Sequence, residues 1–252
     1  MLSFQQTDFI YEPYPIGVAH NVFEDGYYRS LVETFPSADL FKFMASLGNK
    51  YSLSELNNPE QYHDYVNSRA PWREFHRWLK REEFPYEVLS MLSEHQIDLG
   101  VRRPEGNGAE APAPTLLERL RGGRRPAETR GLSARFEFSM LPADGGFIKP
   151  HTDSPQKIVT LVIAMLGDGE WSQSFGGGTE VLRPRDATKN FNYLNRYLEF
   201  EEVETLGTFE YRPNQCVIFI KTFNSLHAVR PMSGNGAGLM RKTLTINIEK
   251  VG

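Results

Sequence analysis

The chain has 252 residues, a formal net charge of −4 and a single cysteine, Cys216. This length suits one domain with its own hydrophobic core. The charge gives no reason to expect nucleic acid, and one cysteine excludes a disulfide framework and any cysteine-based zinc or iron–sulfur site. A reducing, cytoplasmic setting is expected. The first residues lack signal-peptide features, and no apolar run reaches membrane-spanning length, so no membrane partner is expected.

Residues 1–99 read as a mainly helical support with one or two strands. Apolar residues at helical spacing alternate with turn signals, and Pro36 is expected to end the first helix. Residues 37–60 are mixed and rich in turn formers. The expected elements are extended chain over 8–24 and helices over 26–34, 59–79 and 84–99.

Residues 100–131 are rich in Gly, Pro and Arg and predict an exposed, flexible insertion. Such a segment is either an active-site lid or a surface loop without a role in function. From residue 132 onward, short apolar runs between turn residues predict a barrel or sandwich. Residues 184–206 are polar and aromatic and are expected to cover part of it. Strands are expected over 134–141, 157–166, 178–182, 207–211, 215–220, 225–229 and 242–248, which gives one domain, 1–252, with its barrel core at 132–252.

A histidine and a carboxylate two positions apart, His151 and Asp153, lie between a glycine-rich approach and a buried strand. In an extended chain such residues point to the same side, so both can bind one metal ion. His227, in a later strand, would complete a triad of two histidines and one carboxylate. That set holds Fe(II) and leaves coordination positions open. Taken alone, the tripeptide is weak evidence for a metal site, and a turn with Asp153 as a cap and His151 in solvent explains it better.

The last predicted strand begins with Arg241, and Thr243 shares its face. A planar guanidinium beside a hydroxyl is a good clamp for a carboxylate. Three further residues are candidate substrate contacts. Arg135 either meets an anionic substrate or lies at the surface, Glu180 either reaches the pocket or faces water, and Arg230 is a second possible carboxylate partner.

These motifs together resemble the 2-oxoglutarate- and Fe(II)-dependent oxygenases. The order is that of the family: an H-x-D motif, a glycine-rich strand, a distal histidine and an Arg-x-Thr pair. The resemblance is strong over 132–250, and residues 8–36 resemble the N-terminal strand and helix of the prolyl-hydroxylase-like branch. Within 132–250, the matching segments are 146–153, Lys157, Thr160-Leu161, 177–180, 227–231 and 241–245.

The resemblance implies an α+β fold with a mainly β core, a double-stranded β-helix (a distorted, cupin-like jelly roll) with an N-terminal helical scaffold. It implies that His151, Asp153 and His227 hold Fe(II), and that Arg241, helped by Thr243, binds the distal carboxylate of 2-oxoglutarate. With O₂ as the other cosubstrate, a C–H bond of a small-molecule or carrier-bound substrate is hydroxylated and succinate and CO₂ are released. Asp153 argues against halogenation, because halogenating relatives have a small residue there. Hydroxylation is the default outcome, and desaturation, ring formation and epimerisation stay open.

Two alternatives stay open. A peptidyl, prolyl-type hydroxylase would differ in the width of the groove above the metal, which the sequence does not fix. A cupin-like metal-binding isomerase or a non-catalytic binder would need no Arg-x-Thr clamp, so Arg241 and Thr243 argue against it.

Overall fold

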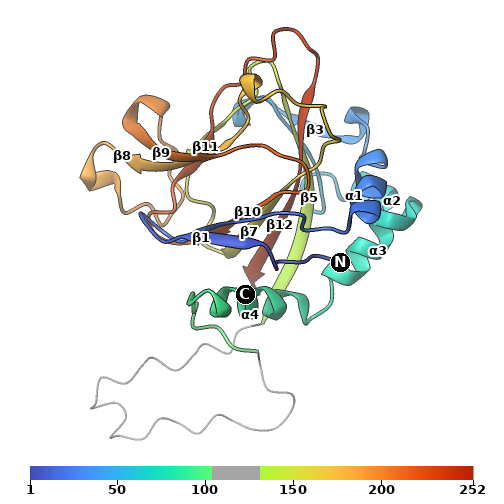
Figure 1. The fold of residues 1–252 in the computed structure, drawn as a ribbon, viewed down its shortest axis with the longest axis horizontal. Helices are drawn as coiled ribbons and strands as arrows, with labels where there is room; N and C mark the ends of the chain where they lie inside the picture. The colour runs from blue at the N-terminus through green and yellow to red at the C-terminus, as the bar shows by residue number, and fades with distance from the viewer. Residues whose placement is uncertain (104–130, 252) are drawn as a thin grey trace, which may run out of the picture.

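The computed structural model describes residues 1–103 and 131–251 and contains two antiparallel sheets with helices on one side (Figure 1). Within these residues the larger sheet has the strand order β1-β2-β10-β7-β12-β5-β4-β3, and the smaller has the order β6-β11-β8-β9. The larger sheet is built from β1 (Thr7–Ile10), β2 (Ile16–Ala19), β3 (Lys42–Met44), β4 (Lys50–Ser54), β5 (Leu132–Pro142), β7 (Lys157–Ala164), β10 (Cys216–Ile220) and β12 (Met240–Lys250). The smaller is built from β6 (Ile148–His151), β8 (Thr179–Pro184), β9 (Val203–Phe209) and β11 (His227–Val229). This is the predicted double-stranded β-helix.

The helices cover the outer face of the larger sheet. They are α1 (Asp25–Glu33), α2 (Pro59–Ser68), α3 (Ala70–Leu79) and α4 (Phe84–Glu94), with α1 to α3 grouped together and α4 running beneath the sheet in Figure 1. Their buried side chains form one cluster with those of β5, β7, β10 and β12. Trp72 of α3 packs edge-on against Phe138 of β5 at a ring-centroid distance of 4.6 Å. Such a pair contributes about 0.5–1.5 kcal/mol beyond its buried area.

Side chains alternate along each strand of the larger sheet, so successive residues point to opposite faces. One face is apolar and packs on the helices. The other face looks toward the smaller sheet and carries polar residues on β5, β7 and β12 and apolar residues on β2 and β10. On β12, Leu244, Ile246 and Ile248 lie in the helix-covered core, whereas Arg241, Thr243 and Thr245 line a cavity between the sheets.

The single helix expected over 59–79 is two helices, with a break at Arg69. Its backbone is extended, with φ −116° and ψ 118°. Pro71 explains the break, because proline has no N–H to donate to the carbonyl of Asn67. That carbonyl instead accepts a hydrogen bond from the Arg73 guanidinium at 2.8 Å.

Residues 37–60, expected to be turn-rich, contain strands β3 and β4, and β4 pairs with β5. The turn between them is anchored on the barrel by Gly48, whose carbonyl accepts from the Phe147 N–H at 3.1 Å. A Cβ at Gly48 would lie 2.0 Å from the Phe147 carbonyl oxygen, and its φ is +73°. Only glycine fits this close approach. The turn therefore reaches the strand that carries His151.

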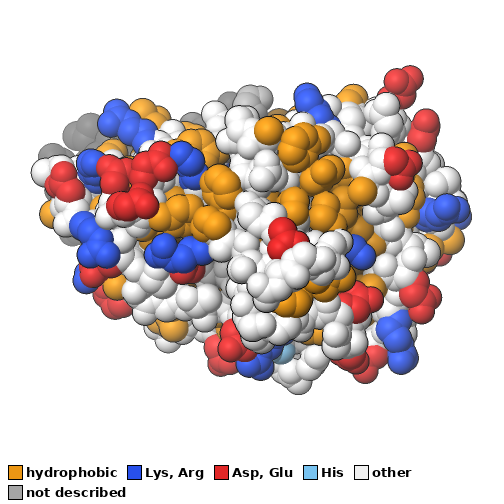
Figure 2. Space-filling view, turned by 90° about the horizontal axis from the view of Figure 1, so that it is seen from above, with side chains coloured by type: hydrophobic (Ala, Val, Ile, Leu, Met, Phe, Trp, Pro, Cys, Tyr) orange, Lys and Arg blue, Asp and Glu red, His pale blue; other side chains and the backbone are white. Residues whose placement is uncertain are grey.

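Most other expected elements are confirmed within a few residues, although α4 ends at Glu94 rather than near residue 99. The predicted insertion, 100–131, falls almost entirely on residues 104–130, which lie outside the described part of the chain. None of the helices in the described ranges has the length and apolar character needed to cross a membrane. Figure 2 shows acidic and basic side chains interspersed around hydrophobic ones on the face seen from above. This face has no large patch of a single charge.

Candidate metal centre

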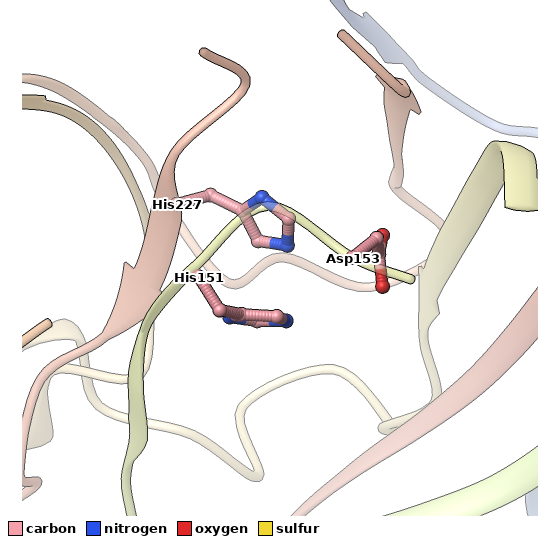
Figure 3. Close-up of side chains that lie close together, drawn as sticks. All are labelled: His151, Asp153 and His227. Atoms are coloured by element: carbon pink, nitrogen blue, oxygen red, sulfur yellow. The ribbon is translucent and has the colours of Figure 1, made fainter. Parts of the chain in front are cut away.

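His151 and His227 are cross-strand neighbours in the smaller sheet. Strand β6 ends at His151, β11 begins at His227, and the antiparallel register places the two residues directly opposite each other. Residues opposite each other on one face lie close enough for their side chains to meet. The two ring centroids are 4.3 Å apart, and Figure 3 shows both rings turned toward Asp153.

Asp153 reaches the same point through a turn. We expected an extended chain to place it beside His151, and this expectation is wrong, because β6 ends at His151 and Asp153 has a φ of +67°. Aspartate tolerates this left-handed conformation better than most residues. One potential ligand atom from each of His151, Asp153 and His227 lies within 4.8 Å of the others, so these three residues form a group that could hold a metal ion.

The histidine rings present suitable donor atoms. Nδ1 of His151 lies 3.0 Å from the Lys149 carbonyl oxygen, and Nδ1 of His227 lies 3.0 Å from the Ser225 carbonyl oxygen. Because a carbonyl only accepts, each Nδ1 carries the proton, and each Nε2 keeps its lone pair. Burial lowers the pKa of His151 to about 3, helped by the neighbouring His227, and burial also lowers the pKa of His227. Both rings are therefore neutral at pH 7, as metal ligation requires.

Asp153 is held as a carboxylate by its neighbours. Lys157 donates to Oδ1 at 2.8 Å, and the Thr160 hydroxyl donates to Oδ2 at 3.0 Å. Burial works against ionisation, but the charge and hydrogen bond of Lys157, together with the two histidines, outweigh it, and the pKa of Asp153 lies below its usual range. Two neutral imidazoles and one ionised carboxylate suit Fe(II) in the facial-triad arrangement.

Two cavities meet at these three residues. The inner cavity, about 120 Å³, lies between the sheets and contains all three together with Arg241 and Thr243. The outer cavity, about 380 Å³, opens toward the surface and is lined by His151 and Asp153. The residues that line both cavities are Lys50, Ile148, His151, Asp153 and Lys157.

Arg241 is a buried cation in the wall of the inner cavity. Its Nε donates to the Gly177 carbonyl oxygen at 2.6 Å, and its guanidinium lies over the Tyr211 ring at 4.8 Å. Among the described residues it has no ion-pair partner. Burial lowers its pKa, and a buried guanidinium without an acid is costly unless a ligand supplies one. This matches a carboxylate-binding role, with Thr243 exposed to the same cavity.

The outer cavity is bounded by two segments. One is the turn between β3 and β4, which contributes Ser46 and Leu47. The other, within residues 184–206, contributes Asn195 and Tyr197, and the Tyr197 ring stacks near His151 at 5.8 Å. Asn195 Oδ1 also accepts from the N–H of Thr152, at 3.2 Å. The expectation that 184–206 covers part of the barrel is met at these residues.

The three other predicted contacts lie away from both cavities and are bound by protein groups. Arg135 donates from Nε and Nη2 to the two oxygens of Glu249, at 2.9 and 2.7 Å. Arg230 donates to Glu180 at 2.8 Å, so these two candidates bind each other. Their role as substrate contacts stays a prediction.

Several site residues gave no sequence signal. Lys50 forms a 2.6 Å ion pair with the buried Glu137, and both line the inner cavity. Lys221 donates to the backbone oxygens of Thr152 and Asp153 at 2.9 and 2.8 Å. A lysine or glutamate in a strand is ordinary in composition, and only the fold brings these residues to the site.

A family model covers the part of the chain that holds the candidate metal centre. Residues 136–249 match the family model of the 2OG-Fe(II) oxygenase superfamily. No curated protein sequence matches the chain.

Similar solved structures include a Pseudomonas putida prolyl-4-hydroxylase, at 13% identity over 94% of this chain and 92% of that chain, with a TM-score of 0.48. HygX from Streptomyces hygroscopicus, solved with nickel and 2-oxoglutarate bound, has 9% identity over 93% and 82%, with a TM-score of 0.48. A prolyl hydroxylase from Trichoplax adhaerens, solved with a peptide fragment, has 12% identity over 93% and 83%, with a TM-score of 0.46.

The matched region contains all three residues of the candidate metal centre together with Arg241 and Thr243. The superfamily uses Fe(II) with 2-oxoglutarate and O₂, and the donor set described above suits this metal. Residues 136–249 therefore form a region of the 2OG-Fe(II) oxygenase superfamily, a superfamily of enzymes, and this region holds the candidate metal centre.

Proposed function

We propose that this oxygenase hydroxylates a C–H bond of a small-molecule or carrier-bound substrate. The observation that carries the proposal is the meeting of two cavities at His151 and Asp153. An oxygenase of this kind must hold a cosubstrate and a substrate on one metal at once. The inner cavity offers the place for the first and the outer cavity the place for the second.

We assign the metal to His151, Asp153 and His227. The two Nε2 atoms and one Asp153 oxygen are the ligand atoms, and the Nδ1 contacts to backbone carbonyls fix both ring orientations. Three protein ligands leave coordination positions for cosubstrates. When bound, Fe(II), 2-oxoglutarate and O₂ together supply the oxidation of a C–H bond, with release of succinate and CO₂.

We assign the distal carboxylate of 2-oxoglutarate to Arg241, with Thr243 as a neighbouring donor. Arg241 is already oriented by the Gly177 carbonyl and the Tyr211 ring, so little side-chain freedom remains to be lost on binding. The acid would also give this buried guanidinium its missing partner. The inner cavity is lined by residues of both sheets, and Leu141, Val162 and Phe219 give it apolar surface beside the polar groups.

The volume of the outer cavity favours a small substrate or the end of a tethered one. About 380 Å³ lies within the range of small-molecule sites. Leu47, Ile148 and Tyr197 give it apolar surface beside polar groups. All described elements surround this one barrel, which supports the predicted single domain, 1–252, with 1–99 as support for the barrel core at 132–252.

Anaerobic addition of Fe(II) and 2-oxoglutarate tests the proposal through the weak visible charge-transfer band of the chelate. We expect the band in the wild-type protein and in Lys189→Met, which removes an ion pair with Glu202 outside both cavities. We expect its loss in His227→Ala through loss of metal. In Arg241→Met we expect weakened 2-oxoglutarate binding with metal affinity retained. If no band appears and no succinate forms in air, the proposal is wrong.

A further inference from the structure

The outer cavity is lined by more positive than negative charge. Its charged lining consists of Lys50, Lys149 and Lys157 against one carboxylate, Asp153. That carboxylate belongs to the proposed metal centre, and a divalent cation there would add positive charge beside it. Glu137 and Glu199, the carboxylates paired with Lys50 and Lys149, are not part of this lining, so a ligand in the cavity meets more ammonium than carboxylate groups.

The three lysines differ in how firmly they are held. Lys50 is bound to Glu137, which is only 8% exposed, so this pair is closed within the protein. Lys149 is paired with Glu199 at 2.6 Å, but the two side chains are 38% and 59% exposed. Water screens such a pair, and a ligand can replace Glu199 at small cost.

Lys157 is paired with a carboxylate that belongs to the candidate metal centre. Its Nζ lies 2.8 Å from Asp153 Oδ1, and its side chain is only 19% exposed. A metal ion and Lys157 would therefore draw on the same carboxylate. A mostly buried ammonium is stabilised by a full negative charge, and the outer cavity offers space for one beside it.

From this charge distribution we infer that the substrate is an acid, whose carboxylate or phosphate group is bound by Lys157, with Lys149 at the cavity rim. The inference rests on the proposed function, because it places the substrate in the outer cavity. Lys157 touches a residue of the metal centre, so an acid bound to it lies against that centre. The carbons next to the acid group are then the ones brought closest to the metal.

Three probes that share a phenylethyl group test this inference: 3-phenylpropanoate, 2-phenylethyl phosphate and the neutral 3-phenylpropanamide. Their ring suits the apolar surface of Leu47 and Tyr197. The protein is loaded with Mn(II) and saturating 2-oxoglutarate, so that the inner cavity is filled. Calorimetry gives each affinity, and paramagnetic relaxation of the probe protons by Mn(II) reports their distance from the metal. No turnover is needed.

We expect at least one acid to bind about 10- to 100-fold more tightly than the amide, as one charged hydrogen bond allows. The protons nearest the acid group should relax fastest. Lys157→Met should remove the preference, whereas Lys157→Arg and the remote Lys189→Met should keep it. The tighter of the two acids identifies the group as carboxylate or phosphate.

Equal binding of acids and amide to the loaded wild-type protein would overturn the inference, as would an unchanged preference in Lys157→Met. Slow relaxation of the bound acid would overturn it too, because the acid would then lie away from the metal. If Lys157→Met no longer binds Mn(II), the inference is still tested by the affinities of the acids and the amide for the wild-type protein and for Lys157→Arg. Failure of the wild-type protein to bind Mn(II) or 2-oxoglutarate would instead contradict the proposed function.

Discussion

Lys221, directly after strand β10, donates to the backbone oxygen of Asp153 at 2.8 Å and to that of Thr152 at 2.9 Å. Its ammonium also reaches the Thr152 hydroxyl at 2.9 Å. Asp153 has a left-handed backbone, which costs an L-residue about 1–2 kcal/mol. Lys221 therefore holds the turn that brings the Asp153 carboxylate to the two histidines.

Lys221→Met should weaken metal binding by about 10- to 100-fold, the usual effect of removing a group that orients a ligand. The loss of a nearby positive charge acts in the opposite direction, so a net weakening reports the loss of positioning. Mn(II) titration of the apo-protein measures it. Lys189→Met removes a lysine whose ion pair lies outside the site and should bind Mn(II) normally. Equal affinity in Lys221→Met and Lys189→Met would contradict the role of Lys221.

Asp153→Asn should keep the fold and lose the metal. Asparagine accepts the left-handed backbone and can still accept the hydrogen bond from Thr160, but it carries no charge. We expect metal affinity to fall by more than about 100-fold, the upper range for groups that only orient ligands. Asp153→Ala should lose metal to the same degree and unfold at lower temperature, because alanine tolerates this φ poorly. Thermal unfolding without metal separates the two variants. If Asp153→Asn and Asp153→Ala unfold at the same temperature, the left-handed backbone at this position does not affect stability as expected.

The sequence predicted the residues of the metal centre because they come as a motif, and it predicted the strands because one face of each is continuously apolar. It did not predict how Asp153 reaches the metal site, since a left-handed residue after a strand has no periodic signal. Lys50 and Glu137 illustrate a second limit. They are far apart in the chain, and only the pairing of β4 with β5 brings them together. Contacts of this kind depend on tertiary structure rather than on local pattern.

Lys50→Met should destabilise the protein by about 3–5 kcal/mol at neutral pH, because it leaves the buried Glu137 without its counter-ion. In the wild-type protein, burial opposes ionisation of Glu137, but Lys50 outweighs it and the pKa is lowered. The pair thus adds stability above the ordinary pKa of 4.5 and loses it as the pH falls through the lowered value.

The stability of Lys50→Met should depend on pH in the opposite sense to that of the wild-type protein. Without Lys50, burial should raise the pKa of Glu137, so the penalty is present at neutral pH and is relieved as Glu137 takes up a proton. Urea unfolding at a series of pH values should show a gap between wild type and Lys50→Met that narrows toward acid. Adding Glu137→Gln to Lys50→Met should recover much of the loss. A gap that does not change with pH would mean that packing, not charge, causes it.

Gly177→Ala should weaken 2-oxoglutarate binding through Arg241, and Gly176→Ala provides the matched control. Both glycines have positive φ, +84° and +81°, so both variants carry a backbone cost. A Cβ at Gly177 would lie 2.9 Å from Met232 Sδ and 3.2 Å from Arg241 Cδ, whereas at Gly176 the nearest atom is 4.0 Å away. Only Gly177→Ala therefore displaces the guanidinium whose Nε donates to the Gly177 carbonyl. We expect about tenfold weaker 2-oxoglutarate binding in Gly177→Ala than in Gly176→Ala, equivalent to one impaired charged hydrogen bond, with equal Mn(II) affinity. Competition binding to the Mn(II)-loaded proteins measures both, and equal 2-oxoglutarate affinities would show that Arg241 does not depend on this glycine.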